Sequence, residues 1–263
     1  MPEPLSLHRA GAALHLTLDR PGLHNAFDAG LIARLTAALE AAGADDGIRA
    51  VVLAGAGASF SAGADLNWMR DMASAGEAEN REDALALARL MRTLDELPKP
   101  TIARVHGAAF GGGVGLVACC DIAIGVPAAK FGLTESRLGL LPAVISPYVV
   151  AAIGPRQARR YFTTAEVFDA AQALRIGLLH EVVEPAALDA AVERQVALLL
   201  RAGPVAAAAA RRLVRDVALE PDRDRLDRAN ANLIAALRVS AEGQEGLSAF
   251  LDKRRPAWTP DGL

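Results

Sequence analysis

The sequence predicts an α/β protein in which short parallel strands alternate with helices, followed by a helical tail. Short apolar runs rich in β-branched residues alternate with amphipathic helical patterns through roughly the first 185 residues. This order is typical of parallel βαβ units with right-handed crossovers. After about residue 186 the strand-like runs cease, and helical patterns continue to about residue 253. Composition supports one main domain with an appendage, because 263 residues with 52% hydrophobic content can build a sizeable core.

The first elements are a hairpin and a helix. Leu5–Arg9 and Ala13–Leu18 alternate apolar and polar residues on either side of an Ala-Gly pair, which predicts a β-hairpin. Asp28 is placed to cap a helix that runs to about Ala42, and Gly43 is expected to end it.

A buried strand and a second amphipathic helix come next. The β-branched run Arg49–Gly55 ends in glycine, as expected of a buried strand that leads into a loop. Asn80–Leu97 has the spacing of a helix, and Pro98 and Pro100 are expected to end it. The apolar side of this helix is predicted to consist of Leu85, Leu87, Leu90, Met91 and Leu94.

Two further strands flank a glycine-rich turn and an apolar helix. Thr101–Val105 and Asp121–Val126 read as strands, and the helix between them covers about Gly112–Cys120. In such sheets the active site tends to lie at the carboxyl ends of the strands. The turn that follows Thr101–Val105 is therefore a candidate position for the site.

The tail is predicted to hold helices at roughly 186–202, 204–218 and 223–238, with a fourth from Ser240 to about Lys253. Its apolar face includes Leu226, Leu233, Ile234 and Leu237. A lone helical hairpin cannot bury such a face, so we expect the tail to pack on the main domain or on another subunit.

Charge, cysteine usage and hydropathy exclude several classes of function. A formal net charge of −3 gives no basic field for a phosphate backbone, so nucleic acid is not expected as a partner. Cys119 and Cys120 are neighbours in an apolar run and read as reduced core thiols of a cytoplasmic protein. No secretory signal, no run of about twenty apolar residues and no metal-ligand spacing is visible, so neither a membrane span nor a metal site is expected.

Three segments carry candidate chemistry, and each also has a simpler interpretation. In Ser59–Leu66, small residues allow close backbone approach to a ligand, but the segment can equally be a tight turn in which Asp65 caps the next helix. In His106–Gly113, the glycines can direct backbone N–H groups and a helix N-terminus at a developing negative charge, or they can form a hinge. The latter segment lacks the spacing of GxGxxG or GxxxxGK[ST], which disfavours phosphate binding.

The third segment is Lys130–Gly139. It contains Glu135, the only carboxylate between Asp121 and Glu166. A partly buried carboxylate in an apolar stretch is a better acid or base near neutral pH. The alternative is that Glu135 pairs with Arg137 or Lys130 at the surface.

Taken together, SAGADL, GAAFGGG with CDIAI, and FGLTE with LGLLP resemble the crotonase (enoyl-CoA hydratase/isomerase) superfamily. Arg20-Pro21, Asn25-Ala26 and the DKRRP segment near the end extend the resemblance over nearly the whole chain. SAGADLNWMRDM and HGAAFGGGVGLVACCDIAI look closest to bacterial methylglutaconyl-CoA hydratases of leucine and isoprenoid degradation. The resemblance implies a crotonase-like spiral core of repeated ββα/βαβ units over residues 1–190, and a helical oligomerisation or lid region over 191–263.

The resemblance also implies a site and a substrate. The backbone N–H groups of Ala64 and Gly112 would hold the oxygen of an acyl-CoA thioester as it becomes an enolate, and Glu135 would act as acid and base. Coenzyme A is then part of the substrate, and no separate cofactor is expected. The N–H of Ala143 would lie near the attacking water, and Lys253 would reach the nucleotide phosphates, across a subunit boundary of a trimer or a dimer of trimers. The full set of implied substrate-binding positions is Leu23, His24, Ala26, Ala62, Asp65, Leu66, Gly111, Gly115, Ala143 and Lys253.

One position departs from the family pattern. Hydratases of the family generally use two glutamates, and the position matching the first is Gly115, which has no side chain to move a proton. The resemblance to the methylglutaconyl group includes glycine here and favours hydration of a branched or carboxylated enoyl-CoA. A Δ3–Δ2 enoyl-CoA isomerase, which needs one glutamate, and a catalytically weak acyl-CoA-binding homologue are the alternatives. Arg137 either attracts a distal substrate carboxylate or is a solvated charge or a subunit contact. His106 either serves the turn or satisfies a backbone carbonyl.

Overall fold

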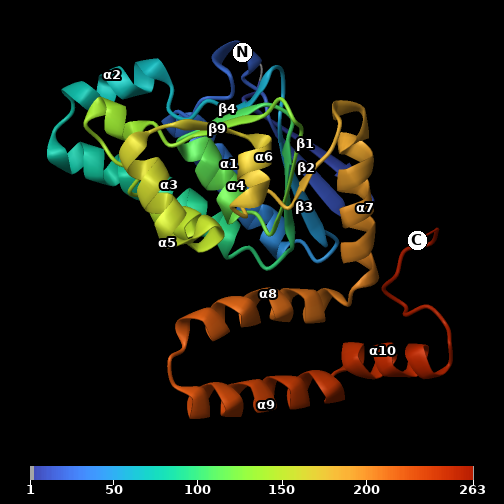
Figure 1. Cartoon of the computed structure of the whole chain (residues 1–263). Helices are drawn as coiled ribbons and strands as arrows, with labels where there is room; N and C mark the ends of the chain where they lie inside the picture. The colour runs from blue at the N-terminus through green and yellow to red at the C-terminus, as the bar shows by residue number, and fades with distance from the viewer. Residues whose placement is uncertain (1–2, 263) are drawn as a thin grey trace.

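The computed structural model describes residues 3–262 and contains two β-sheets surrounded by helices (Figure 1). The larger sheet has the order β1-β2-β3-β5-β7-β10, and all its pairings are parallel except that of β1 with β2. This confirms the α/β class and the N-terminal hairpin. The strands of this sheet are β1 (Leu5–Ala10), β2 (Ala13–Leu18), β3 (Ala50–Gly55), β5 (Thr101–Val105), β7 (Ile122–Gly125) and β10 (Glu181–Val182).

A second sheet, absent from the sequence prediction, lies beside the first. Its order is β4-β6-β8-β9. Three long strands of the larger sheet are each followed directly by one of its short strands, so β3–β4, β5–β6 and β7–β8 begin successive ββα units of the expected spiral. Strands of three residues are too short to show a period, which is why they were missed. These strands are β4 (Ser59–Ser61), β6 (Ala108–Phe110), β8 (Lys130–Gly132) and β9 (Val167–Asp169).

The helices of the core follow the predicted order with changes at their ends. Asp28 caps α1 as expected, but Gly43 lies inside that helix, which continues to Ala44. The predicted helix at Asn80 begins earlier, because the Glu79 carboxylate accepts the N–H of Gly76 and caps α3. The core helices are α1 (Ala29–Ala44), α2 (Leu66–Ser74), α3 (Glu77–Asp95), α4 (Gly112–Cys119), α5 (Ser146–Thr164), α6 (Ala170–Arg175) and α7 (Leu188–Arg201), with short 3-10 turns η1 (Pro21–Leu23), η2 (Glu135–Leu138) and η3 (Pro185–Ala187).

The core lies between the larger sheet and helices on both of its faces. Every residue of β3 is buried. α1 and α3 pack together and contribute their buried leucines on one side, although Leu85, predicted to belong to the apolar side of α3, is 54% exposed. α7 packs against β3, β5 and β7 through residues such as Val192 and Val196. The predicted domain boundary at 190/191 therefore falls inside a helix that belongs to the core packing.

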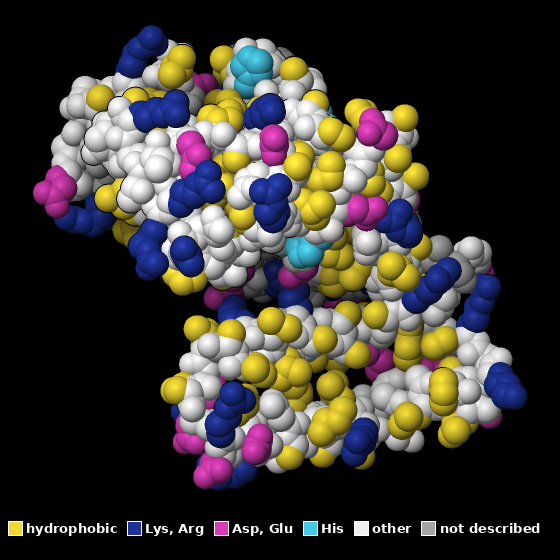
Figure 2. Space-filling view, viewed as in Figure 1, with side chains coloured by type: hydrophobic (Ala, Val, Ile, Leu, Met, Phe, Trp, Pro, Cys, Tyr) yellow, Lys and Arg dark blue, Asp and Glu magenta, His cyan; other side chains and the backbone are white. Residues whose placement is uncertain are grey.

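The remaining helices, α8 (Pro204–Leu219), α9 (Arg223–Val239) and α10 (Ala241–Leu251), form a layer that stands apart from the core (Figure 1). Within these fully described helices, Leu226 and Ala249 are the buried residues. Many apolar side chains are exposed, and hydrophobic patches are visible on this layer in Figure 2. They include Val205, Val214, Val217, Leu219, Ile234, Val239, Leu247, Phe250 and Leu251. The tail thus does not bury its apolar face on its own core.

The layer is joined to the core by a few strong contacts. Arg211 of α8 forms an ion pair with Asp121 at 2.6 Å and donates to the carbonyl of Leu97. Arg49 donates to the carbonyls of Leu200 and Ala202, at the junction of α7 and α8. None of the helices formed by residues 3–262 has both the length and the apolar character to cross a bilayer.

Candidate active site

Two of the three candidate segments lie against each other at the second sheet. β4 and β6 pair in parallel, with Ser59 opposite Ala108. The glycines allow this close approach, since a Cβ on Gly63 would lie 2.8 Å from the carbonyl oxygen of Phe110, and a Cβ on Gly113 would lie 2.5 Å from that of Ser61. Gly63 also has a φ of +85°, a conformation that glycine adopts without strain. The turn at 59–66 and the turn at 106–113 therefore form one surface.

Glu135 joins this surface from the third segment. β8 pairs with β6, and the N–H of Gly111 donates to the carbonyl of Gly132 at 2.9 Å. η2 then brings the carboxyl to the glycine turn, where a Cβ on Gly111 would lie only 3.1 Å from Glu135 Oε1. The three segments that the sequence singled out are thus in contact.

The side chain of Glu135 is partly buried. Its Oε2 is buried without a hydrogen-bond partner in the described chain, and no ion pair with Arg137 or Lys130 forms there. The surface-pairing interpretation is therefore wrong. Burial raises the pKa of the Glu135 carboxyl above its ordinary value, and a hydrogen bond from its own backbone N–H opposes the increase. A carboxyl with a raised pKa is a better proton donor and acceptor near neutral pH.

Two backbone N–H groups of these turns are unused. Gly112 is the first residue of α4, so its N–H has no partner within the helix and lies at the positive end of the helix dipole. The N–H of Ala64 lies between two hydrogen bonds, from Phe27 to Gly63 and from Asp65 to Phe27, but itself meets no acceptor. Across residues 3–262, neither N–H is donated to another group. Two such donors can stabilise a negatively charged oxygen.

Phe27, which the sequence reasoning missed, supports both of these N–H groups. Its backbone bonds to Gly63 and Asp65 at 2.6 and 2.8 Å hold the strand-like segment around Ala64. Its ring lies against the other turn, because a Cβ on Gly112 would be 2.6 Å from Phe27 Cε2. The side chain is 1% exposed. A single buried aromatic residue after the His24-Asn25-Ala26 turn has no local signal that marks this function.

Asp65 and Ala26 hold the turn in place. The Asp65 carboxylate caps α2 by accepting the N–H of Asn67 at 2.8 Å, and it forms an ion pair with Arg20 at 3.2 Å. Arg20 also donates to the carbonyl of Ala26 at 2.6 Å and forms an ion pair with Asp28. The helix-cap interpretation of Asp65 is confirmed, and its buried carboxylate is occupied by partners in the chain rather than free for a substrate.

The other residues expected along the coenzyme path lie together at the surface. The N–H of Ala62 donates to the carbonyl of His24 at 2.9 Å, which joins the turn at residues 23–26 to the turn at 62–66. His24 Nδ1 is 3.0 Å from Ser59 Oγ. Leu23 and Leu66 are 47% and 71% exposed, and Ala62 is also exposed. Their role in binding substrate stays a prediction.

Four further candidate positions lie in different surroundings. Gly115 is buried in α4, where a Cβ would lie 2.4 Å from Ile145 Cγ2. The N–H of Ala143 donates to the carbonyl of Leu141 at 2.8 Å, and its position near an attacking water stays a prediction. Lys253 follows α10 and is exposed, and its predicted contact with the nucleotide phosphates stays a prediction. His106 Nε2 lies 2.9 Å from the carbonyl oxygen of Gly57, as the backbone-satisfying interpretation predicted.

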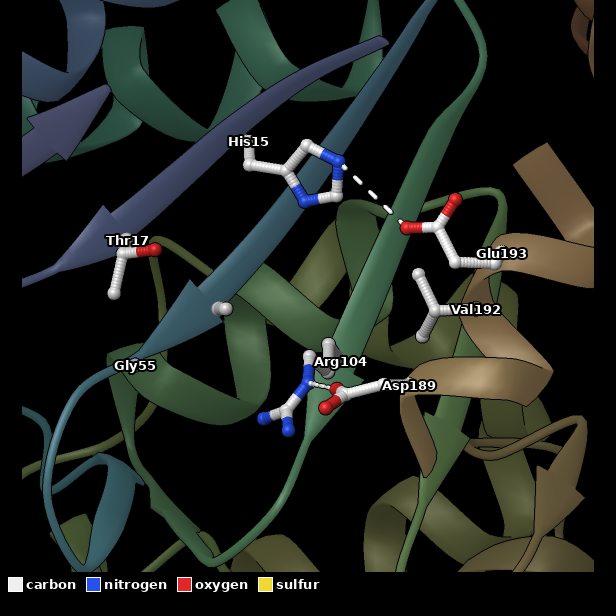
Figure 3. A pocket seen from close by; sticks show the side chains of 8 residues that line it. His15, Thr17, Gly55, Arg104, Asp189, Val192 and Glu193 are labelled. Atoms are coloured by element: carbon white, nitrogen blue, oxygen red, sulfur yellow. Dashed lines mark hydrogen bonds and ion pairs between the residues drawn. The ribbon is translucent and has the colours of Figure 1, made fainter. Parts of the chain in front are cut away.

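A separate cavity of about 330 Å³ lies between α7 and the strands β2, β3 and β5 (Figure 3). His15 points toward Glu193, with Nε2 and Oε1 3.9 Å apart, and Arg104 forms an ion pair with Asp189 at 2.6 Å. None of the predicted site residues lines it. In the part of the chain that the structure describes, no group of three or more His, Cys, Asp or Glu side chains is arranged to hold a metal ion.

Comparison with known proteins is consistent with this geometry. The family model "Enoyl-CoA hydratase/isomerase" matches residues 9–261. The crystal structure of an enoyl-CoA hydratase from Shewanella pealeana superposes with a TM-score of 0.95 at 44% identity, covering 97% of this chain and 96% of that one. The 2,3-dehydroadipyl-CoA hydratase of Escherichia coli is 34% identical over 96% of this chain and 97% of its own length. The crotonyl-CoA hydratase of Syntrophomonas wolfei is 31% identical over 91% of this chain and 92% of its own. The chain therefore belongs to the enoyl-CoA hydratase/isomerase family, within the crotonase superfamily.

Proposed function

We propose that this protein adds water to an enoyl-CoA thioester, with the N–H groups of Ala64 and Gly112 holding the thioester oxygen and Glu135 moving the protons. The observation that carries the proposal is the pair of unpartnered N–H groups next to a carboxyl with a raised pKa. Removing one such donor typically costs about 10²–10³-fold in rate.

The reaction can be completed with one carboxylate. The ionised Glu135 takes a proton from water as the water oxygen bonds to the β-carbon, and the negative charge moves to the thioester oxygen between the two donors. The protonated Glu135 then gives the proton to the α-carbon as the enolate collapses to the thioester. One hydrogen and one hydroxyl are added in total, and Glu135 returns to its ionised form. A pKa raised by burial makes the ionised Glu135 a stronger base for taking the proton from water.

A branched or carboxylated acyl chain, such as that of 3-methylglutaconyl-CoA, is the proposed substrate class. Arg137 lies two residues from Glu135 in η2, is exposed, and makes no ion pair with residues 3–262. A guanidinium at this position is suited to bind a distal carboxylate. Related enzymes carry names that include both crotonyl-CoA, which has no such group, and 2,3-dehydroadipyl-CoA, which has one.

We further propose that the protein is a homo-oligomer, a trimer or a dimer of trimers. The proposal is supported by the α8–α10 layer, whose exposed apolar side chains find no cover on their own core. Sedimentation velocity of the purified protein measures the assembly directly. A monomer at micromolar concentration would contradict it.

The first experiment incubates the protein with 3-methylglutaconyl-CoA and with crotonyl-CoA in H₂¹⁸O and follows the products by mass spectrometry. Incorporation of ¹⁸O that disappears in Glu135→Gln is the expected result. Preference for the carboxylated substrate should fall in Arg137→Met, while activity with crotonyl-CoA should remain. If the ratio of the two activities is unchanged in Arg137→Met, the substrate class is wrong.

The alternatives have distinct outcomes in the same assay. An isomerase is favoured by the single carboxylate at the site, and it would move a double bond and exchange the α-proton without incorporating ¹⁸O. A binding protein would bind CoA thioesters tightly with no turnover of either substrate.

A further inference from the structure

We infer that Ile145 is a positioning residue that fills the space into which any side chain at position 115 would project, and so keeps a second carboxylate from α4 out of the site. The catalytic part of this inference rests on the proposed function. The packing part does not.

Gly115 and Glu135 lie at the same junction of helices. The N–H of Gly115 donates to the carbonyl of Gly111 at 3.2 Å, so Gly115 is one helical turn from the glycine whose Cβ position faces Glu135 Oε1. Ile145 immediately precedes α5, and α5 packs both on α4 and on η2, which carries Glu135. A longer side chain at position 115 would therefore enter the region between α4, α5 and η2.

That region is already filled. A Cβ on Gly115 would lie 2.4 Å from Ile145 Cγ2, 2.9 Å from Ile145 Cβ and 3.2 Å from Met91 Cε. Ile145 is 3% exposed and Met91 is fully buried, so neither side chain can turn into solvent to make room. Even a methyl group at position 115 must displace Ile145, and a carboxylate would need the space of several more atoms. Close-packed interiors resist such additions.

The consequence is apolar packing at position 115 in place of a second acid. Two carboxyl groups at such a junction would titrate together, because the charge of each would shift the pKa of the other. With Ile145 in this space, α4 places no carboxylate beside Glu135. Oε2 of Glu135 has no partner in the described structure. Ile145 thus occupies the space that a second proton-carrying side chain at position 115 would need.

The packing part is tested by a double-mutant cycle in thermal unfolding, which needs no activity. Gly115→Ala should lower the Tm in the natural background, and the decrease should shrink or reverse when Ile145→Ala is present. Gly30→Ala in α1 is the matched control, because a Cβ there meets nothing closer than 3.4 Å and should leave the Tm unchanged or raise it. Equal effects of Gly115→Ala in both backgrounds would overturn the inference.

The catalytic part compares Gly115→Glu/Ile145→Ala with Gly115→Gln/Ile145→Ala, which has the same size but no charge. With crotonyl-CoA, the Glu form should add a second ionisation to the pH profile of kcat and change kcat by about tenfold or more relative to the Gln form. Gly115→Glu alone should unfold at lower temperature than the double variant. Identical pH profiles for the Glu and Gln forms, or natural stability of Gly115→Glu alone, would refute the role of Ile145. Failure of the proposed function is recognised separately, since the natural protein would then turn over no enoyl-CoA.

Discussion

Replacing Phe27 tests whether the two proposed donors depend on one buried ring. Phe27 is 1% exposed, and its ring occupies the space next to Gly112 while its backbone holds the segment around Ala64. Phe27→Leu keeps both backbone hydrogen bonds and replaces the ring with a smaller branched side chain. We expect a stability cost of about 1–2 kcal/mol, compared with about 3–5 kcal/mol for complete truncation to Ala.

The catalytic effect should exceed what this loss of stability alone would cause. A partly displaced Gly112 N–H should lower kcat by about tenfold or more, toward the limit of about 10²–10³ for a lost donor, while KM changes less. Denaturant unfolding and steady-state hydration kinetics measure the two effects. Phe168→Leu is the matched control. Phe168 lies in β9 and is also buried, but it packs on Phe131 and Tyr161. If both variants lose the same stability and both keep kcat, Phe27 does not position the donors.

Three further predictions concern ionisable groups. Folding raises the pKa of Glu135, so the stability that this carboxyl contributes is present below its unfolded pKa and is lost as pH rises through its folded pKa. Glu135→Gln should therefore raise the Tm at pH 7 but not at pH 4. Equal gains in Tm at the two pH values would contradict this. Burial lowers the pKa of His15 despite Glu193, so stability should fall as pH drops below about 6.5, and His15→Asn should flatten that part of a Tm titration. Asp65→Ala removes the cap of α2 and one partner of Arg20, and should cost about 1–3 kcal/mol in denaturant unfolding, whereas Asp71→Ala in the same helix should cost little.

The sequence was informative where a signal is local. Asp28 before a helical stripe and the β-branched run ending at Gly55 predicted α1 and β3 correctly, since caps and periodicity involve neighbouring residues. Glu135 stood out as an isolated carboxylate in an apolar stretch, and burial of its side chain bears this out.

The sequence was uninformative where the structure depends on packing between distant segments. The strands of the second sheet are each three residues long and have no readable period. Phe27 contacts Gly112, and Ile145 fills the space over Gly115, across 85 and 30 positions that no local pattern connects. For the same reason the occupied N–H of Ala143 became visible only with the fold.

The proposed oxyanion donors belong to the main chain, which determines how mutation can damage them. Replacement of Ala64 by any residue except proline keeps its N–H, so the donor itself is largely insensitive to sequence drift. The directions of the two donor N–H groups depend instead on Gly63 and Gly111, with φ values of +85° and +50°, and on the lack of a side chain at Gly112. A saturation scan should therefore tolerate many residues at position 64 and few at its glycine neighbours. The activity of this site should therefore be most sensitive to substitution at residues whose side chains never contact a thioester.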